Sequence, residues 1–432
     1  MTPSGLDDNT DTNPPTGARI EVNTAPARNE LSAPRRSKAS WLRSPQRVFL
    51  RRALFQVHLW TGVALAAYAV VIGLTGSALV FETELNHNLH PALYHLTSTP
   101  RRVSLDATIG QIKTVHPGWI AFALRNFEDP TGATDLLMRP ASGENTPNYR
   151  IVSFNPYTGE ILLDRLRFTG ALGFLSNLHV YLLSGETGLL ISGWMAVGLF
   201  LLCVTGLVLW WPGVQRWTAA LLLKRRSSWL RVNWDLHTVI GFWTSAAFIA
   251  VIVTGIDFAF PGPTGKIIEL LTGAGYRDTG VSLDAISLKP TRSDAPIITT
   301  DQAVAAAKRA LPQDAPAGYM SLPASPASPF RVTGYYKGAA PYSQLVRILL
   351  DPHTGALLAS SSTRDQDRGS RMEQYFVAVH FGLFGGDGVP GLLVKIAWVL
   401  LGLVPALLAF TGLTMYWTRK LRPLWRRLSL KG

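Results

Sequence analysis

The chain has 432 residues, of which 47% are hydrophobic, and a formal net charge of +13. Long apolar blocks without charged residues alternate with short basic clusters. This segregation excludes an ordinary soluble domain, in which apolar residues recur at helical or strand period. The basic clusters flank the apolar blocks, so the positive charge gives no reason to expect nucleic acid as a partner.

Residues 1–45 are rich in Pro, Asn, Thr, Ser and Arg, and we expect a disordered basic tail there, without a cleavable signal peptide. Four apolar blocks follow. Each is long enough to cross a bilayer as a helix, which takes about 20 residues. A lone strand in lipid would leave its backbone groups unsatisfied, so each block must be helical. We expect these membrane helices within 46–82, 171–215, 234–257 and 376–418.

Clusters of lysine and arginine flank the apolar blocks at one side of the predicted bundle. They precede the first block, fill residues 216–233, and follow the fourth block in 419–432. The positive-inside rule then places both termini and the middle loop in the cytoplasm. Residues 83–170 and 258–375 are therefore expected to be two extracytoplasmic domains. The single cysteine, Cys203, lies inside the second block and is predicted to be a packing residue.

The chain aligns with itself. The residues of the first block that recur without a gap in the third are His58, Gly62, Thr75, Gly76 and Phe81, matched by His237, Gly241, Thr254, Gly255 and Phe260. His179 and Thr205-Gly206 match His380 and Thr411-Gly412 in the other two blocks. Each outer segment carries a helical stretch, 105–115 or 300–311, and then a hairpin pattern at 149–162 or 345–358. The sequence thus predicts an integral membrane α-helical protein built as two helix–domain–helix units, each with a small α+β domain.

Four histidines occupy repeated positions: His58, His179, His237 and His380. A titratable side chain in a membrane helix is costly, so it indicates function. One histidine per helix, without Cys or Glu at helical spacing, does not suit zinc but is typical of low-spin haem b. Depth pairs His58 with His237 on the cytoplasmic side and His179 with His380 on the outer side. Crossed pairs would also satisfy the count, and simple hydrogen bonds between helices are an alternative role.

The Thr-Gly pairs lie at the expected depths of these histidines, since each residue of a helix rises about 1.5 Å. Glycine could admit a flat macrocycle to the backbone, or could serve ordinary close packing of membrane helices. Both interpretations stay open. Among the other histidines, we expect His87, His90 and His95 to form a solvated cluster, and His116 and His353 to be structural or exposed.

The repeated unit resembles the PepSY-associated transmembrane family of bacterial iron-regulated inner-membrane proteins. The resemblance rests on QVHLWTGVALAAYAVVIGLTGSALVF (56–81), DLHTVIGFWTSAAFIAVIVTGIDFAF (235–260), NLHVYLL (177–183), AVHFGLFGG (378–386) and the NPxTG and DPxTG hairpins. It implies periplasmic PepSY-like domains and two haems b with His58, His179, His237 and His380 as axial ligands. It further implies reduction of an Fe(III)–siderophore at the periplasmic face, which releases Fe(II).

The sequence has no GxGxxG after a strand and no CxxC cluster, so electrons are expected from a quinol or a separate cytoplasmic reductase. Two other classes remain as alternatives. The outer domains could make the chain a non-enzymatic periplasmic binding, assembly or sensor protein. The bundle could also be a permease for haem or metal chelates, although four helices are few and Pro405 is the one evident helix breaker. Cofactor content distinguishes the three.

Overall fold

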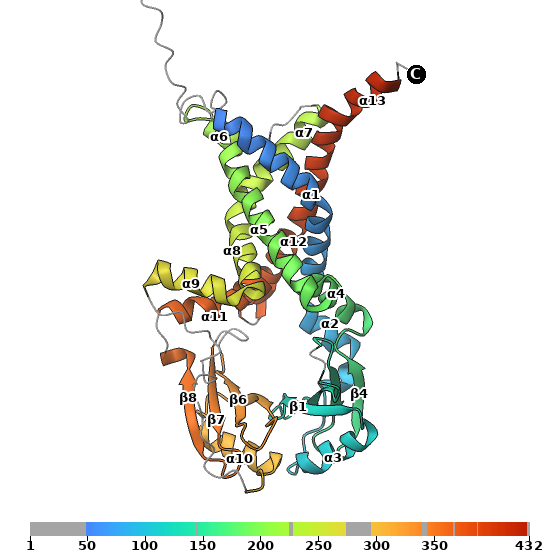
Figure 1. Cartoon of the computed structure of the whole chain (residues 1–432), viewed down its shortest axis with the longest axis vertical. Coiled ribbons are helices and arrows are strands. Elements are labelled where there is room, and N and C mark those ends of the chain that lie inside the picture. The colour runs from blue at the N-terminus through green and yellow to red at the C-terminus, as the bar shows by residue number, and fades with distance from the viewer. Residues whose placement is uncertain are drawn as a thin grey trace, which may run out of the picture.

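The computed structural model describes residues 49–143, 146–223, 228–273, 295–338, 344–365, 368–386 and 388–429. The tail expected over 1–45 lies outside these residues. A bundle of long helices occupies one end of the molecule and a β-sheet layer occupies the other (Figure 1). Both described ends of the chain lie at the end of the bundle away from the sheet.

Within the described residues, four helices are long and apolar enough to cross a membrane, which confirms the four expected blocks. The helices and their direct extensions are α1 (Phe49–Leu79), α5 (Gly185–Trp210), α7 (Trp229–Asp235) with the π-turn η3 (Leu236–Ile240) and α8 (Gly241–Ala259), and α12 (Gly388–Tyr416) with the π-turn η6 (Trp417–Leu421) and α13 (Arg422–Ser429). The third helix begins inside the expected loop 216–233, and the fourth continues into the expected tail. An ion pair from Arg231 to Asp235 (2.9 Å), one helical turn apart, stabilises the first of these extensions.

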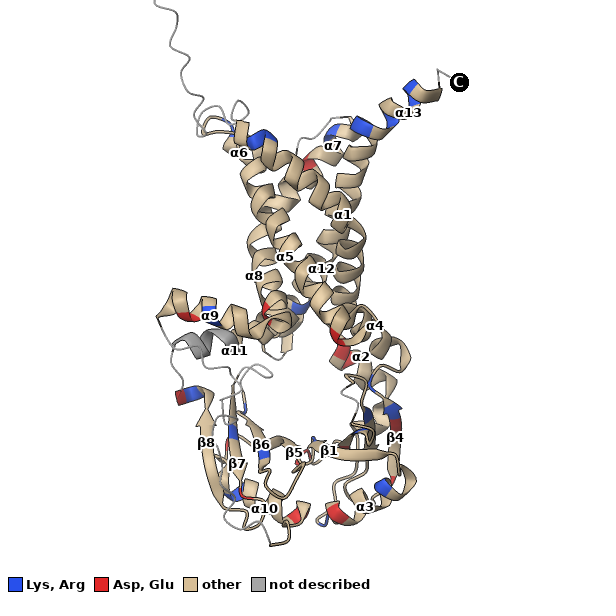
Figure 2. Cartoon of the chain, viewed as in Figure 1, with Lys and Arg blue, Asp and Glu red and all other residues tan. Residues whose placement is uncertain are grey.

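Short helices lie at both ends of the bundle. Those between the bundle and the sheet are α2 (Glu82–Leu89), η2 (Pro91–Leu93), α4 (Gly170–Tyr181), α9 (Pro261–Thr272) and α11 (Arg368–Phe381). At the opposite end, α6 (Trp217–Ala220) follows α5. Charged residues at that opposite end are mainly lysine and arginine, whereas both signs of charge occur over the sheet (Figure 2).

The β-strands of both outer segments form one antiparallel sheet of eight strands. In chain order they are β1 (Trp119–Arg125), β2 (Thr134–Pro140), β3 (Arg150–Phe154), β4 (Ile161–Leu166), β5 (Ala317–Ser321), β6 (Phe330–Tyr335), β7 (Leu345–Leu350) and β8 (Leu357–Ser362). The order across the sheet is β4-β3-β2-β1-β5-β6-β7-β8. The predicted hairpins are β3–β4 and β7–β8. The halves join where β1 pairs with β5, with Leu124 opposite Met320. The sequence did not predict this seam.

Helices α3 (Leu105–Val115) and α10 (Thr300–Ala310), close to the predicted ranges, cover one face of the sheet. The two halves share one apolar core on that face, with Phe154 from the first and Phe330 from the second both nearly inaccessible. A shared core means that the two outer segments form a single structural layer.

The first turns of α3 and α10 cap each other. The Asp301 carboxylate accepts a hydrogen bond from the Leu105 backbone N–H (3.0 Å), and the Asp106 carboxylate accepts from those of Thr300 (2.9 Å) and Asp301 (3.0 Å). Negative charge at a helix N-terminus is stabilised by the free N–H groups and the helix dipole. The pair therefore fastens the two halves together on the side of the sheet away from the bundle.

Replacing Asp106 with Ala should destabilise the sheet layer by roughly 0.5–2 kcal/mol, the usual cost of losing a helix cap. Faster amide hydrogen exchange in α3 and α10 of the full chain in detergent would report this loss. Glu160→Ala, an exposed carboxylate in the β3–β4 turn, serves as the control. Equal exchange in the two variants would contradict the capping role.

The same cap should weaken in acid. Burial raises the pKa of the Asp106 carboxyl, but hydrogen bonds from Asp301 and Thr300 outweigh burial and lower it below the ordinary 3.8. A lowered folded-state pKa stabilises the fold above the ordinary pKa, and the contribution is lost as pH falls through the lowered value. In the wild type, protection of the α3 and α10 amides from hydrogen exchange should therefore fall only at strongly acidic pH. The D106A variant should lack this acid-dependent loss of protection.

Candidate functional site

The four repeated histidines come together as two pairs inside the bundle. His58 on α1 and His237 in the π-turn η3 have ring centroids 6.4 Å apart, with the ring planes at 89°. His179 on α4 and His380 on α11 are 6.3 Å apart, at 68°. These are the pairs that depth predicts, and the crossed pairs do not form. Each pair takes one histidine from each half of the chain, so both sites lie between the halves.

Each imidazole is held by the threonine of a Thr-Gly pair. His58 Nδ1 lies 3.0 Å from Thr205 Oγ1, and His179 Nδ1 lies 2.9 Å from Thr75 Oγ1. In the second half, His237 Nδ1 lies 2.9 Å from Thr411 Oγ1, and His380 Nδ1 lies 2.8 Å from Thr254 Oγ1. The same arrangement thus occurs four times, always within one half of the chain.

The second contact of each threonine decides the direction of these bonds. Thr75 Oγ1 lies 2.7 Å from the Val71 carbonyl oxygen, and the other three hydroxyls lie 2.7–2.8 Å from a carbonyl one turn earlier in their own helices. A carbonyl oxygen can only accept, so the threonine hydroxyl donates its hydrogen bond to the carbonyl. The threonine oxygen then accepts a hydrogen bond from the Nδ1–H of the histidine. This assigns the proton of each neutral ring to Nδ1 and leaves the Nε2 lone pair available for a metal.

The glycine of each Thr-Gly pair lies against the same ring. A Cβ atom at Gly76 would lie 2.9 Å from His179 Cε1, closer than such contacts normally come. At Gly206, Gly255 and Gly412 the corresponding distances to His58, His380 and His237 are 3.3, 3.4 and 3.3 Å. The sequence left macrocycle approach and helix packing as alternatives. In the structure the nearest neighbour of each glycine is the imidazole itself.

All four rings line one internal cavity of about 500 Å³ that also touches residues of all four long helices. Its walls are mainly aliphatic and aromatic, and Tyr68 and Phe248 line its middle. The volume lies within the usual range for ligand sites, about 300–1,000 Å³. The cavity therefore connects the two pairs through an apolar interior.

The two histidines that lie outside the membrane-spanning helices are strongly desolvated. Burial lowers the pKa of His179 to about 3, with a further contribution from the neighbouring His380, and burial lowers the pKa of His380 to about 4. Both rings are therefore neutral at ordinary pH, which is the form that binds a metal.

The donor set can be tested against haem. A metal between two rings of one pair would sit at about 2.0–2.1 Å from each nitrogen, the usual imidazole–metal distance, and the centroid separations leave room for this. Within the described ranges, no group of three or more His, Cys, Asp or Glu side chains could hold a metal ion. Two imidazoles in an apolar cavity suit a metal that brings its other ligands with it. The residues present therefore fit haem better than a bare ion.

The remaining histidines and the cysteine have other surroundings. His87 lies against Tyr94 (3.7 Å between centroids), His116 Nε2 lies 3.0 Å from Asp164, and both ring nitrogens of His353 contact backbone carbonyls. Cys203 lines the apolar cavity. Sequence reasoning missed the π-turn that carries His237 and the buried Asn233, whose Nδ2 donates to the Thr411 carbonyl (3.0 Å).

The fold and the site together define a multi-pass membrane protein with paired histidines between its two halves. Residues 55–420 match the family described as the PepSY-associated TM region, so the chain belongs to that family. Comparison with curated proteins finds no match.

Gly76→Ala should destabilise the protein by about 1–3 kcal/mol, because the added methyl group must displace the His179 ring in a packed interior. Gly62→Ala on the same helix is the matched control, since its Cβ would make only an ordinary contact of 3.7 Å with Leu202. Thermal unfolding of both variants in detergent would measure the difference. A G62A protein as unstable as G76A would show that the close approach to His179 is not the cause.

Proposed function

We propose that this chain is a di-haem electron-transfer protein of the bacterial inner membrane that reduces an Fe(III)–siderophore at the periplasmic face. The observation that carries the proposal is the fourfold arrangement of a histidine, a threonine and a glycine, which leaves an Nε2 lone pair on each ring of two neighbouring histidine pairs. Bracing the bundle would require neither a common tautomer nor paired rings.

The proposal includes an orientation. The end of the bundle rich in lysine and arginine (Figure 2) faces the cytoplasm under the positive-inside rule, and the sheet layer is then periplasmic. We take the two halves as copies of one helix–domain–helix unit whose PepSY-like parts fuse into that layer. His58 and His237 serve the cytoplasmic side, and His179 and His380 serve the periplasmic side.

The chain's residues would bind, orient and insulate the cofactor. His58 with His237, and His179 with His380, would supply the axial nitrogens. The threonine hydroxyls hold each ring in one tautomer and strengthen it as a ligand, as partners of metal-bound histidines commonly do. The mainly apolar cavity walls would surround the cofactor with a low-dielectric environment. Haem bound at each pair would supply a one-electron Fe(III)/Fe(II) couple whose potential depends on the axial ligands and burial.

The substrate step needs no acid or base from the protein. One electron reduces the chelated Fe(III) to Fe(II), and the hard oxygen ligands of a siderophore hold Fe(II) much less strongly, so the metal is released and the chelator stays intact. The electron would come from a quinol or a cytoplasmic reductase. The alternatives, a binding, assembly or sensor protein and a chelate permease, require no tightly held redox cofactor.

The purified protein in mild detergent should contain two b-type haems per chain by pyridine hemochrome assay, with the sharp reduced bands of bis-histidine ligation. Each single His→Ala change at positions 58, 179, 237 and 380 should remove one haem and leave the other. A colourless protein, expressed with adequate haem supply, would contradict the proposal and favour a binding role.

Thr205→Val should raise the reduction potential of the cytoplasmic-side haem and weaken its retention about 10–100-fold, the usual effect of removing a hydrogen-bond partner of a metal-bound histidine. Thr205→Ser keeps the hydroxyl and should resemble the wild type. Spectroelectrochemical titration would resolve the two haems. If the serine and valine variants changed equally, the hydroxyl would not be the cause.

A further inference from the structure

The face of the sheet that looks toward the bundle is rich in arginine. Because α3 and α10 cover the other face, at the end of the molecule farthest from the bundle, this face is the inner one (Figure 1). Arg165 on β4 pairs in register with Ile151, which packs with Ala123 and Leu137 on the inner face. Arg167 follows on the same side, with its backbone N–H bonded to the Tyr149 carbonyl.

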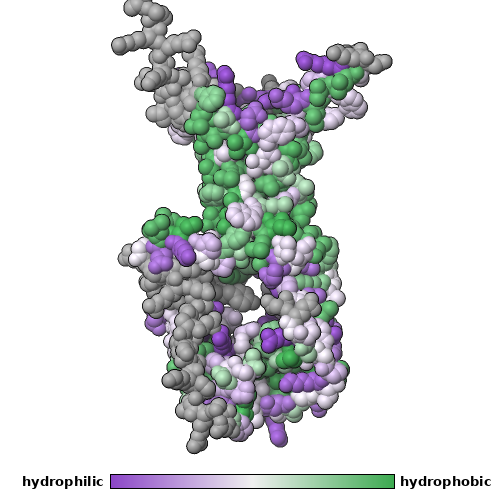
Figure 3. Space-filling model, viewed as in Figure 1, coloured by the Kyte–Doolittle hydropathy of each residue, from purple (hydrophilic) through white to green (hydrophobic). Residues whose placement is uncertain are grey.

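The inner face borders an open space. The space-filling view shows an opening between the bundle and the sheet layer, with hydrophilic residues beside it (Figure 3). Helix α2 descends from the bundle on the β4 side, and α4 returns to the bundle on the same side (Figure 1). Arg165 and Arg167 therefore lie on the inner face, on the side of the sheet where α2 and α4 connect it to the bundle.

Neither Arg165 nor Arg167 forms an ion pair within the described part of the chain. Arg165 is half-buried, and its Nε has no hydrogen-bond partner there. The guanidinium of Arg167 lies over three aromatic rings, with distances from its carbon to the ring centroids of 5.3 Å for Tyr149, 5.0 Å for Phe168 and 5.9 Å for Tyr181. It also donates one long hydrogen bond (3.4 Å) to the carbonyl oxygen of Pro147. A half-buried guanidinium without an anion has lost hydration that no ion pair replaces.

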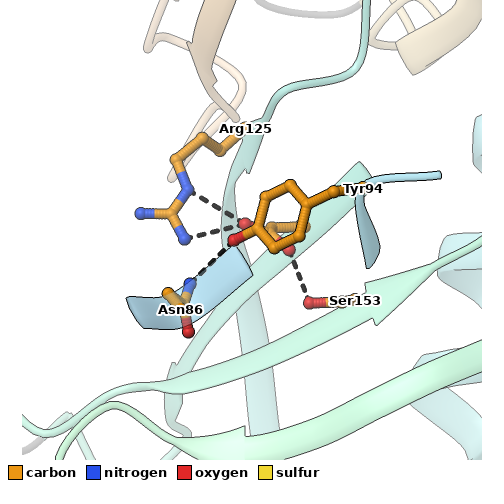
Figure 4. A network of polar contacts seen from close by, with 5 residues as sticks. Asn86, Tyr94, Arg125 and Ser153 are labelled. Carbon is orange, nitrogen blue, oxygen red and sulfur yellow. Dashed lines mark hydrogen bonds and ion pairs between the residues drawn. The ribbon is translucent and has the colours of Figure 1, made fainter. Parts of the chain in front are cut away.

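The nearest carboxylate on the sheet is already used. Asp135 accepts two hydrogen bonds from Arg125, at 3.0 Å from Nε and 2.7 Å from Nη2, and one from the Ser153 hydroxyl at 2.6 Å (Figure 4). Tyr94 and Asn86 bond to each other beside this network (Figure 4). The negative charge of Asp135 therefore compensates the positive charge of Arg125. It does not compensate the positive charges of Arg165 and Arg167.

Glu82, the first residue of α2, is the other carboxylate near these arginines. Burial raises its pKa, and the positive charges of Arg167, Arg165 and Arg125 oppose that rise. One carboxylate facing Arg165 and Arg167 leaves a net positive charge. The other half of the inner face adds Arg331 and Arg347, which lie at register positions on the same side of β6 and β7.

Arg167 lies beside α4, the helix that carries His179 of the outer histidine pair. Arg167 stacks on Tyr181, which is two residues beyond His179 on α4. The aligned hairpins place Ser361 and Thr363 at the corresponding positions of the second half. The two unpaired guanidiniums therefore distinguish the first half from its copy, at the side of the bundle where the substrate would be reduced.

We infer that Arg165 and Arg167 form a binding site for the anionic groups of a ferric chelate, so that the protein selects carboxylate-bearing, negatively charged chelates over cationic ones. Guanidinium can bind carboxylates through paired hydrogen bonds while it stacks on aromatic rings, and Arg167 already has such aromatic contacts. This inference deepens the proposed reductase function and rests on it for turnover, but not for binding.

Binding can be measured without electron transfer, using gallium(III) citrate as a redox-inert anionic chelate. Equilibrium dialysis with metal analysis should show saturable binding to the wild-type protein and about a tenfold weaker affinity for R165Q/R167Q, in keeping with the size of focused electrostatic effects. Arg309→Gln, an exposed arginine on α10 on the far side of the sheet, is the control for loss of charge. Equal affinities in all three proteins would overturn the inference.

Turnover supplies a second measurement. Anionic ferric citrate should reoxidise the dithionite-reduced protein faster than a cationic ferric trihydroxamate, and added salt should slow the citrate reaction. R165Q/R167Q should lose about tenfold in rate with citrate only. Equal rates for both chelates, unaffected by salt or by the double variant, would overturn the inference and leave the reductase intact.

Other outcomes distinguish a failure of the reductase proposal from a failure of the proposed arginine site. If neither chelate reoxidises the protein, the reductase proposal fails, while the gallium measurement still decides the binding site. If R165Q/R167Q loses a haem, the arginines hold haem carboxylates instead, and the inference is overturned.

Discussion

The hydrogen bond from each histidine Nδ1 to a threonine hydroxyl is the interaction on which the bundle depends. An imidazole buried among apolar helices loses the water that satisfied both nitrogens, and an unpaired buried donor is costly. Each threonine oxygen accepts a hydrogen bond from one ring nitrogen, which satisfies that buried donor. The threonine hydroxyl in turn donates a hydrogen bond to a backbone carbonyl of its own helix. The other nitrogen, Nε2, carries the lone pair of the neutral ring.

The second constraint is that the two halves must stay together. Each histidine–threonine bond lies within one half, whereas each histidine pair joins the halves. The sheet layer also joins the two halves, because β1 and β5 pair across the seam and Asp106 and Asp301 cap each other's helices. A site formed between two fused halves keeps its ring separation only while both contacts persist, so the sheet layer also sets the geometry inside the bundle.

The two halves differ at several aligned positions. The third helix carries a π-turn at His237 and buried Asp235 and Asp257, whereas the aligned residues of the first helix are Gln56 and Ala78. The first half instead carries Arg165 and Arg167. A π-turn inserts one residue into a helix and is often found at functional sites. Differences of this kind give the two similar halves different side chains at the two ends of the bundle.

The sequence by itself determined the membrane helices, the four histidines, their pairing by depth and the two hairpins. These features are local or periodic, since apolar length, charge-free blocks and turn residues such as Asn155 and Gly159 act within one segment. Doubling of the Thr-Gly pairs also marked their importance. Only the tertiary structure decided what those pairs contact, that β1 and β5 fuse two expected domains into one sheet, and that Arg165 and Arg167 form no ion pair with another described residue. Contacts between residues far apart in the chain depend on how whole elements pack, and no local pattern in the sequence records that.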